Sequence, residues 1–566
     1  MMRASACWLL VSCWAFAVVG QTTALGQEGK SAPDAKEAKP SARKMTAQEL
    51  AVWIDERFEK EYERLGAKPG AAVDDATYLR RVYLDLQGRI PTVAQLRDFL
   101  ADEGSFKRQD YVDRLLTADA RPDRYARRSS DNLARVWRRM MIPTSSPGAG
   151  MATQLEPWLA RQFSANTPYD QFARKLLLAT PVPQVRGFGG TPAPAPTTPA
   201  DPDADAALFQ QAVGFMPENL ASAYTRVFLG VRLNCAQCHD HPFTNWKQQD
   251  FWGMAAFFNS PRAVGEAPPE GKEPPPPPPP SDQPVPVPTI QATGSSSENA
   301  VYTAKLLWEK ETLKEIAKGK TPRDLLADWM VAPQNPNFAA TAVNRTWQYL
   351  CGRGLAGSVD DLDRVSKQER AILDELAQLF IDSGYDVRWL ITGICKSKVY
   401  QQTLAADADA DTLVERPLKT LLPEQVFDSL EQALSLPVAK ADNGPRWSGE
   451  RDQFVSRMNE AAPESPVDYK GGIPQALMLM NGKITANATS LDSSRTLRAV
   501  VEAPFLAPQE KIETLYLAAV TRKPTAKEMD YLLAHVNEQK GEEQQKQAYA
   551  QIMWGLLNSP EFVLSR

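Results

Sequence analysis

Of all its sequence features, the proline-rich stretches of this chain most constrain how it can be divided into domains. Seven consecutive prolines run from Pro274 to Pro280. Such a run adopts the extended polyproline II conformation and spans about 22 Å at roughly 3.1 Å per residue. We interpret residues 261–300 as a spacer between two domains, residues 46–260 and 301–566, rather than as a ligand for a proline-recognition partner. A second proline-rich stretch, residues 181–206, is predicted to be an extended insertion in the first domain.

The spacing of apolar residues predicts helices in both domains. The segment from Met45 to Leu65 carries its large apolar residues on one helical face. The segment from Ile372 to Phe380 repeats that pattern, and Gly384 follows it as a C-terminal stop. Strict alternation of apolar and polar residues is scarce. The expected fold class is therefore mainly α, with two helical domains joined by a proline-rich linker.

The two domains share a short repeated sequence pattern, which we call the echo. A Tyr-Leu pair, a proline and a threonine recur at the same spacing, ending at Thr92 in one domain and Thr525 in the other. Each threonine is a good helix N-cap, and Gln95 or Glu528 three residues later completes a capping box. The proline before each cap discourages continuation of the preceding helix. We expect a structural helical corner in each domain rather than a DNA-binding element.

The N-terminus has the features of an export signal. Arg3 supplies a charge, Cys7–Val19 is an apolar run, and Ala24-Leu25-Gly26 offers small residues for cleavage. The run is shorter than the roughly 20 residues that a transmembrane helix needs. We expect residues 1–26 to be a signal peptide and residues 27–45 a disordered leader. The mature protein would be periplasmic, extracellular or on the cell surface, with no transmembrane segment after cleavage; a tethered N-terminus is the alternative.

Charge and cysteine content narrow the function classes. The net charge is −5, so we expect no nucleic-acid partner. Four cysteines follow the signal, too few to staple 566 residues, so packing must supply the core. Cys351 and Cys395 lie beside apolar residues and are expected to be buried thiols rather than a disulfide. Three histidines make a Ser-His-Asp triad implausible. Whether the protein is an enzyme stays open, an extracytoplasmic hydrolase being the third candidate.

The chemistry of the chain concentrates in one short segment. Cys235, Cys238 and His239 form Cys-x-x-Cys-His, the attachment sequence of a c-type haem. The two thiols would form thioethers to the haem, and the adjacent imidazole would bind the iron from one side. His241 lies two residues after His239 and cannot easily cross to the opposite face. This interpretation gives an exported redox protein that exchanges electrons with a cell-envelope partner.

Two other interpretations use the same residues. Cys235, Cys238 and His241 have a Cys-x-x-Cys-x-x-His spacing that suits zinc or iron, with His239 or Asp240 completing the site. A site of that kind would belong to a structural or cell-surface interaction protein. The third interpretation is a disulfide between the two cysteines, either structural or redox-active.

Longer motifs give a family resemblance. Residues 73–92, 166–172 and 228–258 resemble the planctomycete cytochrome-c-like domain of unknown function, and the Cys-x-x-Cys-His lies in the third of these stretches. Residues 335–385 and the later sequence Leu556-Leu-Asn-Ser-Pro-Glu-Phe562 resemble the companion domain usually fused to it. The resemblance covers most of residues 46–566. It implies an exported protein whose biochemical activity is not established.

A second polar cluster accompanies the companion motifs. Asn344, Arg345, Arg353, Asp360 and Asp361 lie near one another in sequence, around a glycine-rich helix end. Such residues can bind an anion or a sugar. Charged groups in this pattern more often pair with one another, so we expect a buried ion-pair network that fixes a joint between helices.

Overall fold

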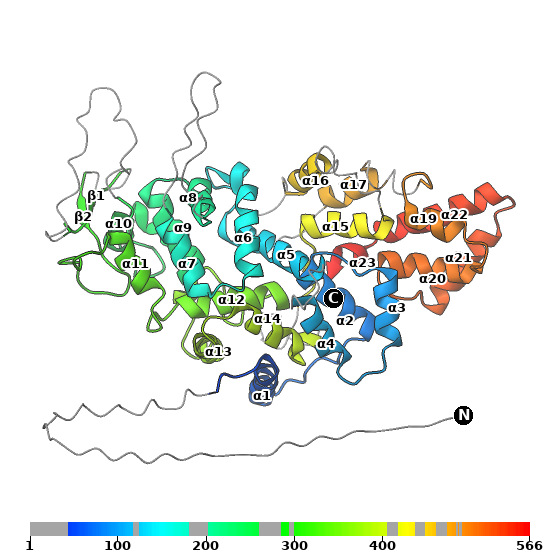
Figure 1. The fold of residues 1–566 in the computed structure, drawn as a ribbon, viewed down its shortest axis with the longest axis horizontal. Helices are drawn as coiled ribbons and strands as arrows, with labels where there is room; N and C mark the ends of the chain where they lie inside the picture. The colour runs from blue at the N-terminus through cyan, green and yellow to red at the C-terminus, as the bar shows by residue number, and fades with distance from the viewer. Residues whose placement is uncertain are drawn as a thin grey trace, which may run out of the picture. The chain divides into compact units, whose positions relative to one another are not determined.

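The computed structural model describes most of the chain after residue 42 (Figure 1). The described ranges are 43–116, 124–179, 202–259, 285–293, 299–403, 417–435, 448–459, 473–482, 485 and 490–565. Helices dominate them, which confirms the mainly α fold class. The predicted signal peptide, most of the predicted leader, and the larger parts of the predicted insertion and linker lie outside the described residues.

The helices before the predicted linker are α1 (Ala47–Leu65), α2 (Asp75–Gln87), α3 (Val93–Ala101), α4 (Lys107–Leu116), α5 (Arg124–Met141), α6 (Glu156–Ser164), α7 (Tyr169–Leu178), α8 (Ala207–Val213), α9 (Pro217–Leu229) and α10 (Gln248–Ala256). Those after it are α11 (Pro322–Met330), α12 (Phe338–Cys351), α13 (Ala371–Asp382), α14 (Val387–Lys396), α15 (Pro423–Leu434), α16 (Ser448–Asn459), α17 (Ile473–Asn481), α19 (Arg495–Val501), α20 (Pro508–Ala519), α21 (Ala526–Asn537), α22 (Glu542–Leu557) and α23 (Pro560–Val563). Short 3₁₀ turns are η1 (Ala149–Leu155), η2 (Ala204–Ala206), η3 (Asn234–Gln237), η4 (Leu362–Arg364) and η5 (Val399–Gln401).

Two small antiparallel pairs of strands accompany the helices. β1 (Thr289–Gln291) pairs with β2 (Val301–Thr303), and Ile290 lies opposite Tyr302. β3 (Lys419–Thr420) pairs with β4 (Leu564–Ser565). β1 falls inside residues 261–300, so part of the predicted linker forms a strand. Strands of two or three residues are too short to show alternation in the sequence, which is why no sheet was expected.

Local signals place the helix ends where the sequence predicts them. Thr46 and Glu49 form a capping box at the start of α1, with the Thr46 amide 2.7 Å from the Glu49 carboxylate. α1 ends at Gly66, which has a left-handed φ of 64°. α13 likewise ends just before Gly384, at φ 82°. Both helices expected from apolar spacing are therefore confirmed.

The echoed helix starts are also confirmed. At the start of α3 the Thr92 amide donates to Gln95 at 2.8 Å, and the Gln95 amide donates back to the Thr92 hydroxyl at 3.1 Å. At the start of α21 the Thr525 amide donates to Glu528 at 2.7 Å, with the reciprocal bond at 3.3 Å. Each pair satisfies helix-terminal amides that otherwise have no partner.

The echo extends to the residue that ends the preceding helix. Gly88 follows α2 with a φ of 68°, and Thr521 follows α20 at the corresponding position with a φ of 61°. A β-branched residue seldom adopts this region, so tertiary packing must hold Thr521 there. The two corners are in contact, since α3 packs against α20 (Figure 1). Arg97 of α3 donates to the Thr514 hydroxyl of α20 at 3.1 Å.

The larger hydrophobic core draws on helices from both sides of the predicted linker. α1 packs along α14, and the Phe58 ring stacks on Trp347 of α12 with a centroid distance of 5.3 Å. Tyr169 of α7 stacks on Phe338 of α12 at 5.1 Å. Because these aromatic rings bury large apolar areas, they contribute strongly to the stability of one shared core.

The second core is built from α15 to α17 and α19 to α23, and it is completed by residues at and just after the end of α2. Leu84 and Ile90 are fully buried among its side chains. Arg80 reaches across from α2 and donates to the carbonyl oxygens of Glu561 at 2.9 Å and Phe562 at 2.8 Å. The first predicted domain therefore contributes both apolar and polar anchors to the C-terminal core.

Apart from Leu84, Ile90 and Leu517, the buried residues of the larger core end at Tyr400 and those of the second core begin at Leu421, so the change does not fall at residues 261–300. Both cores belong to one compact unit, Lys44–Arg566. Contacts between residues hundreds of positions apart leave no local pattern, so the proline content alone did not locate this change. Within the described ranges, no helix combines the length and apolar character needed to cross a bilayer.

Candidate functional site

The Cys-x-x-Cys-His sequence lies on a surface turn directly after α9. α9 ends at Gly230, whose φ is 59° and where a Cβ would lie 2.9 Å from the carbonyl oxygen of Val359, so only glycine fits without strain. η3 follows, with Ala236 fully buried and Cys235 and Cys238 exposed on either side of it. No disulfide joins the two cysteines. We call residues 235–241 the Cys/His turn.

The two histidines of the turn differ in which ring nitrogen carries the proton. His239 is exposed, and its Nδ1 lies 2.8 Å from the carbonyl oxygen of Asp240, which can only accept. A neutral His239 therefore carries its proton on Nδ1, and its Nε2 then presents a lone pair. His241 Nδ1 instead accepts from the amide of Phe243 at 3.1 Å, so a neutral His241 carries its proton on Nε2. The hydrogen bonds thus prepare His239, not His241, as a ligand through Nε2.

α10 holds the turn from one side. The carbonyl oxygen of Gln237 accepts from the indole Nε1 of Trp252 at 3.1 Å, and the Trp252 ring is only 1 % exposed. Asp240 accepts from the backbone amide of Gln248, the first residue of α10, at 3.1 Å. An acidic oxygen at a helix N-terminus is stabilised by the unpaired amides there. The turn is thereby fastened at its middle and at the residue that orients His239.

The part of the chain after the linker holds the turn from another side. Leu362 donates its amide to the carbonyl oxygen of Gly230 at 2.9 Å. The indole Nε1 of Trp246 donates to Asp363 Oδ2 at 2.5 Å. Burial raises the pKa of Asp363 above its ordinary value, although the hydrogen bond from Trp246 works in the opposite direction.

The Asp360 carboxylate forms ion pairs with three arginine side chains close to the Cys/His turn. Its carboxylate pairs with Arg345, which is 1 % exposed, with Arg232 at 3.2 Å and with Arg226 at 3.8 Å. Burial alone would raise the pKa of Asp360, but Arg345 and Arg226 lower it below its ordinary value. Burial lowers the pKa of Arg226 to about 10, still charged at neutral pH.

This geometry confirms the predicted ion-pair network for Arg345 and Asp360. Asn344 is buried with them, and its side chain exchanges hydrogen bonds with the backbone of Ala356 at 2.9 and 3.3 Å. Asp361 instead pairs with Arg364 at 3.6 Å and is partly exposed. Sequence reasoning missed Arg226 and Arg232 because they lie more than a hundred residues away from Asp360. Gly230 at the end of α9 was a local sign of these contacts, because a glycine allows the backbone there to come close to another segment.

The residues of the turn fit the chemistry of a c-type haem. Covalent attachment requires two accessible thiols, and axial ligation requires an imidazole whose Nε2 is left available. Cys235, Cys238 and His239 meet both requirements. Among the described residues no three His, Cys, Asp or Glu side chains converge closely enough to hold a metal ion.

The other two described cysteines behave as the sequence predicts. Cys351 is 7 % exposed and Cys395 is fully buried, and neither forms a disulfide. Both belong to the larger hydrophobic core. The prediction of buried thiols is confirmed.

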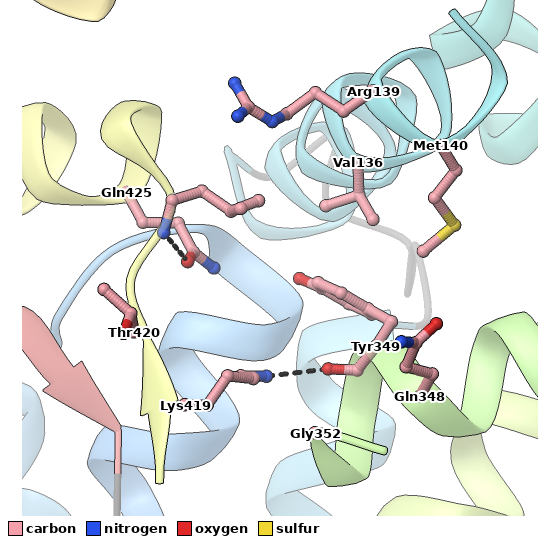
Figure 2. Close-up of a pocket in the computed structure, with 10 residues that line it drawn as sticks. Val136, Arg139, Met140, Gln348, Tyr349, Gly352, Lys419, Thr420 and Gln425 are labelled. Carbon is pink, nitrogen blue, oxygen red and sulfur yellow. Dashed lines mark hydrogen bonds between the residues drawn. The ribbon is translucent and has the colours of Figure 1, made fainter. Parts of the chain in front are cut away.

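A small cavity lies apart from the turn, where α5, α12, α15 and β3 meet (Figure 2). Its volume is about 40 Å³, and it is lined by Val136, Arg139, Met140, Gln348, Tyr349, Gly352, Lys419, Thr420, Leu422 and Gln425. Lys419 donates to the Tyr349 carbonyl oxygen at 2.7 Å (Figure 2). Arg139 also pairs with Glu424 at 3.1 Å. A space of this size holds a few water molecules at most.

Fold and site together define a mainly helical chain whose surface Cys/His turn is held by residues from both sides of a proline-rich segment. Residues 53–263 match the family PSCyt2, described as "Protein of unknown function (DUF1549)". Residues 322–466 match the family PSD1, described as "Protein of unknown function (DUF1553)". No curated protein and no solved structure matches the chain. The Cys/His turn lies in the first matched stretch, and the segment Val359–Arg364 lies in the second.

Proposed function

We propose that this chain is an exported electron-transfer protein that carries one covalently attached c-type haem. Cys235 and Cys238 would form the thioethers, and His239 would supply the axial imidazole. The observation that carries the proposal is the hydrogen bond between His239 Nδ1 and the Asp240 carbonyl oxygen, which leaves Nε2 available. A metal-ligating histidine in proteins usually has this kind of partner on its other nitrogen.

The surroundings of the turn suit transfer of electrons at a surface. When bound, the haem supplies a one-electron redox centre. Cys235, Cys238 and His239 are all exposed, so a redox or cell-envelope protein partner can approach the attachment site without rearrangement of the core. Attachment of this haem outside the cytoplasm agrees with the signal peptide expected at residues 1–26.

The proposal is tested by producing the full chain in a bacterial host that attaches c-type haem in its periplasm. Purified protein, denatured and reduced in alkaline pyridine, should retain the haemochrome band of a haem with two thioether bonds. Cys235→Ser and Cys238→Ser should each shift or abolish that band. N-terminal sequencing should begin after the predicted cleavage site, at Gln27.

A matched pair of variants separates haem from the non-haem metal interpretation. His239→Gln should alter the haem absorption spectrum strongly, whereas His241→Gln should leave it nearly unchanged. If metal analysis instead gives one zinc or iron per chain without haem, and His241→Gln removes that metal, the electron-transfer function is wrong. In that case the structural or cell-surface interaction protein is the better interpretation.

A further inference from the structure

The segment Val359–Arg364 makes ordered contacts with both ends of the Cys/His turn. Upstream of the turn, Leu362 donates to the Gly230 carbonyl oxygen at 2.9 Å, and Asp360 pairs with Arg232 at 3.2 Å. Arg232 lies three residues before Cys235. A segment that the sequence places in the companion domain therefore fixes the backbone that leads into the two cysteines.

Downstream of the turn the contact runs through one tryptophan. Asp363 Oδ2 accepts from the Trp246 indole at 2.5 Å, and the Trp246 carbonyl oxygen accepts from the His241 amide at 2.8 Å. The Trp246 ring also packs edge-on against Trp308, with a centroid distance of 5.9 Å. The loop between His241 and Trp246 is thus closed by a backbone hydrogen bond whose acceptor residue is anchored by Asp363.

Asp363 is an unusual hydrogen-bond acceptor for the Trp246 indole. Its Oδ1 is buried and accepts no hydrogen bond from the described residues, although a buried carboxylate oxygen without a partner costs free energy. An amide side chain at this position would also accept from the Trp246 Nε1, but it would carry no charge. The carboxylate adds what a neutral acceptor cannot, a negative charge behind the Cys/His turn.

We propose that Asp363 is a positioning residue for the Cys/His turn: it orders the turn through Trp246 and places a negative charge where a cofactor on that turn experiences it. The proposal rests on the function proposed above for the charge effect, but not for the ordering of the turn. A negative charge near a redox centre stabilises its oxidised form, so loss of the charge raises the reduction potential.

The ordering is tested on the full chain by amide hydrogen exchange of residues 238–247, with or without cofactor. Asp363→Ala should accelerate exchange there roughly ten- to hundredfold, because a hydrogen bond to a charged group is lost. Asp363→Asn keeps an acceptor for the indole and should restore slow exchange. Trp246→Phe keeps an aromatic ring and removes the hydrogen-bond donor, so it should accelerate exchange as Asp363→Ala does. It provides the test if Asp363→Ala folds poorly. Exchange within twofold of the parent in both Asp363→Ala and Trp246→Phe overturns the proposal.

The charge is tested on haem-loaded protein by its midpoint potential. Asp363→Ala and Asp363→Asn should both raise the potential, whereas Asp374→Ala, which removes an exposed acid paired with Arg370 in the same half of the chain, should leave it unchanged. An unchanged potential in both Asp363 variants overturns the charge effect. Absence of haem from the parent protein refutes the proposed function, and the exchange measurement then still decides the ordering of the turn.

Discussion

Arg345 donates a hydrogen bond to Asp360 from a side chain that is only 1 % exposed, and the same carboxylate also faces Arg226 and Arg232. Arg345 reaches further, to the carbonyl oxygen of Val227 in α9 at 3.1 Å. The pair therefore joins α12 to the helix that leads into the Cys/His turn. An arginine this deeply buried is tolerated only because a carboxylate neutralises it.

Removal of the shared carboxylate should strongly destabilise the protein. Asp360→Ala leaves Arg345 and Arg226 buried without their counter-charge, so we expect a loss of about 3–5 kcal/mol in the free energy of unfolding. Urea unfolding followed by circular dichroism measures it. Asp361→Ala is the matched control, because that acid is more exposed and pairs with Arg364 at 3.6 Å. Equal stability of the two variants would show that the arginine cluster is hydrated rather than dependent on Asp360.

The sequence predicts the parts of this structure that depend on residues close to one another in the chain. The ends of α1 and α13, and the capping boxes at Thr92 and Thr525, depend on residues a few positions apart, and all were found as expected. The Cys-x-x-Cys-His sequence is also local, but it identifies candidate ligands and not a structural element. The pattern carries no information on how the Cys/His turn is held.

The rest depends on contacts between distant residues. Asp363 meets Trp246 across 117 positions, and Arg232 meets Asp360 across 128. Neither contact produces a periodicity or a spacing rule. The shared core has the same origin, since the Phe58 ring finds Trp347 through folding and not through any repeat in the sequence. Proline content indicates where a chain is extended, but it does not indicate which helices pack together.

Acid sensitivity should arise at the junction of the two cores. Glu424 of α15 is 4 % exposed and pairs with Arg138 at 2.9 Å and Arg139 at 3.1 Å. Burial alone would raise its pKa, but the two arginines lower the pKa of Glu424 to about 2. A depressed acid contributes stability above its unfolded pKa, near 4.3, and that stability is lost as the pH falls through about 2.

Glu424→Gln should therefore be destabilised at pH 7 and should lose less further stability than the parent between pH 5 and pH 2. We expect a difference of a few kcal/mol at pH 7, since a buried charge pair is broken. Thermal melts at several pH values measure it. A parent and a variant whose melting temperatures fall in parallel below pH 5 would contradict this assignment.

Asp55 should show the opposite pH dependence. It accepts from the amides of Lys398 at 2.7 Å and Val399 at 3.3 Å, yet burial raises its pKa to about 6. The folded state then binds the proton more tightly than the unfolded state, so this contribution is full below about pH 4 and is lost as the pH rises through about 6.

Asp55→Asn keeps an oxygen for the two amides and removes the charge. Because Asp55 is only partly buried, we expect a modest gain of roughly 1 kcal/mol at pH 7 and no gain at pH 4. Urea midpoints at the two pH values, compared with those of the parent, provide the measurement. A variant less stable than the parent at pH 7 would show that the ionised carboxylate is the better acceptor here.

The echoed caps should contribute comparable free energies. Thr92→Ala and Thr525→Ala each remove a side-chain acceptor from a capping box, at a cost of about 1 kcal/mol. Thr92→Ser and Thr525→Ser retain the hydroxyl and serve as controls with little expected effect. Urea unfolding should rank each alanine variant below its serine counterpart; the reverse order at either site would exclude a capping role there.

The final prediction concerns whether the two halves of the chain separate. A protease site introduced within residues 265–272, followed by complete cleavage, would give two fragments that the sequence alone predicts to be independent domains. The structure gives a different expectation, because the larger core contains helices from both fragments and Arg80 anchors the C-terminal core through the carbonyl oxygens of Glu561 and Phe562. The fragments should co-elute on size exclusion and unfold in one transition near the parent's melting temperature.

Asp85→Ala, which removes a fully buried carboxylate that pairs with Lys419 and accepts from Tyr400 at 2.7 Å, should weaken that association. Fragments that elute separately and melt independently would instead establish the proline-rich segment as a true domain boundary.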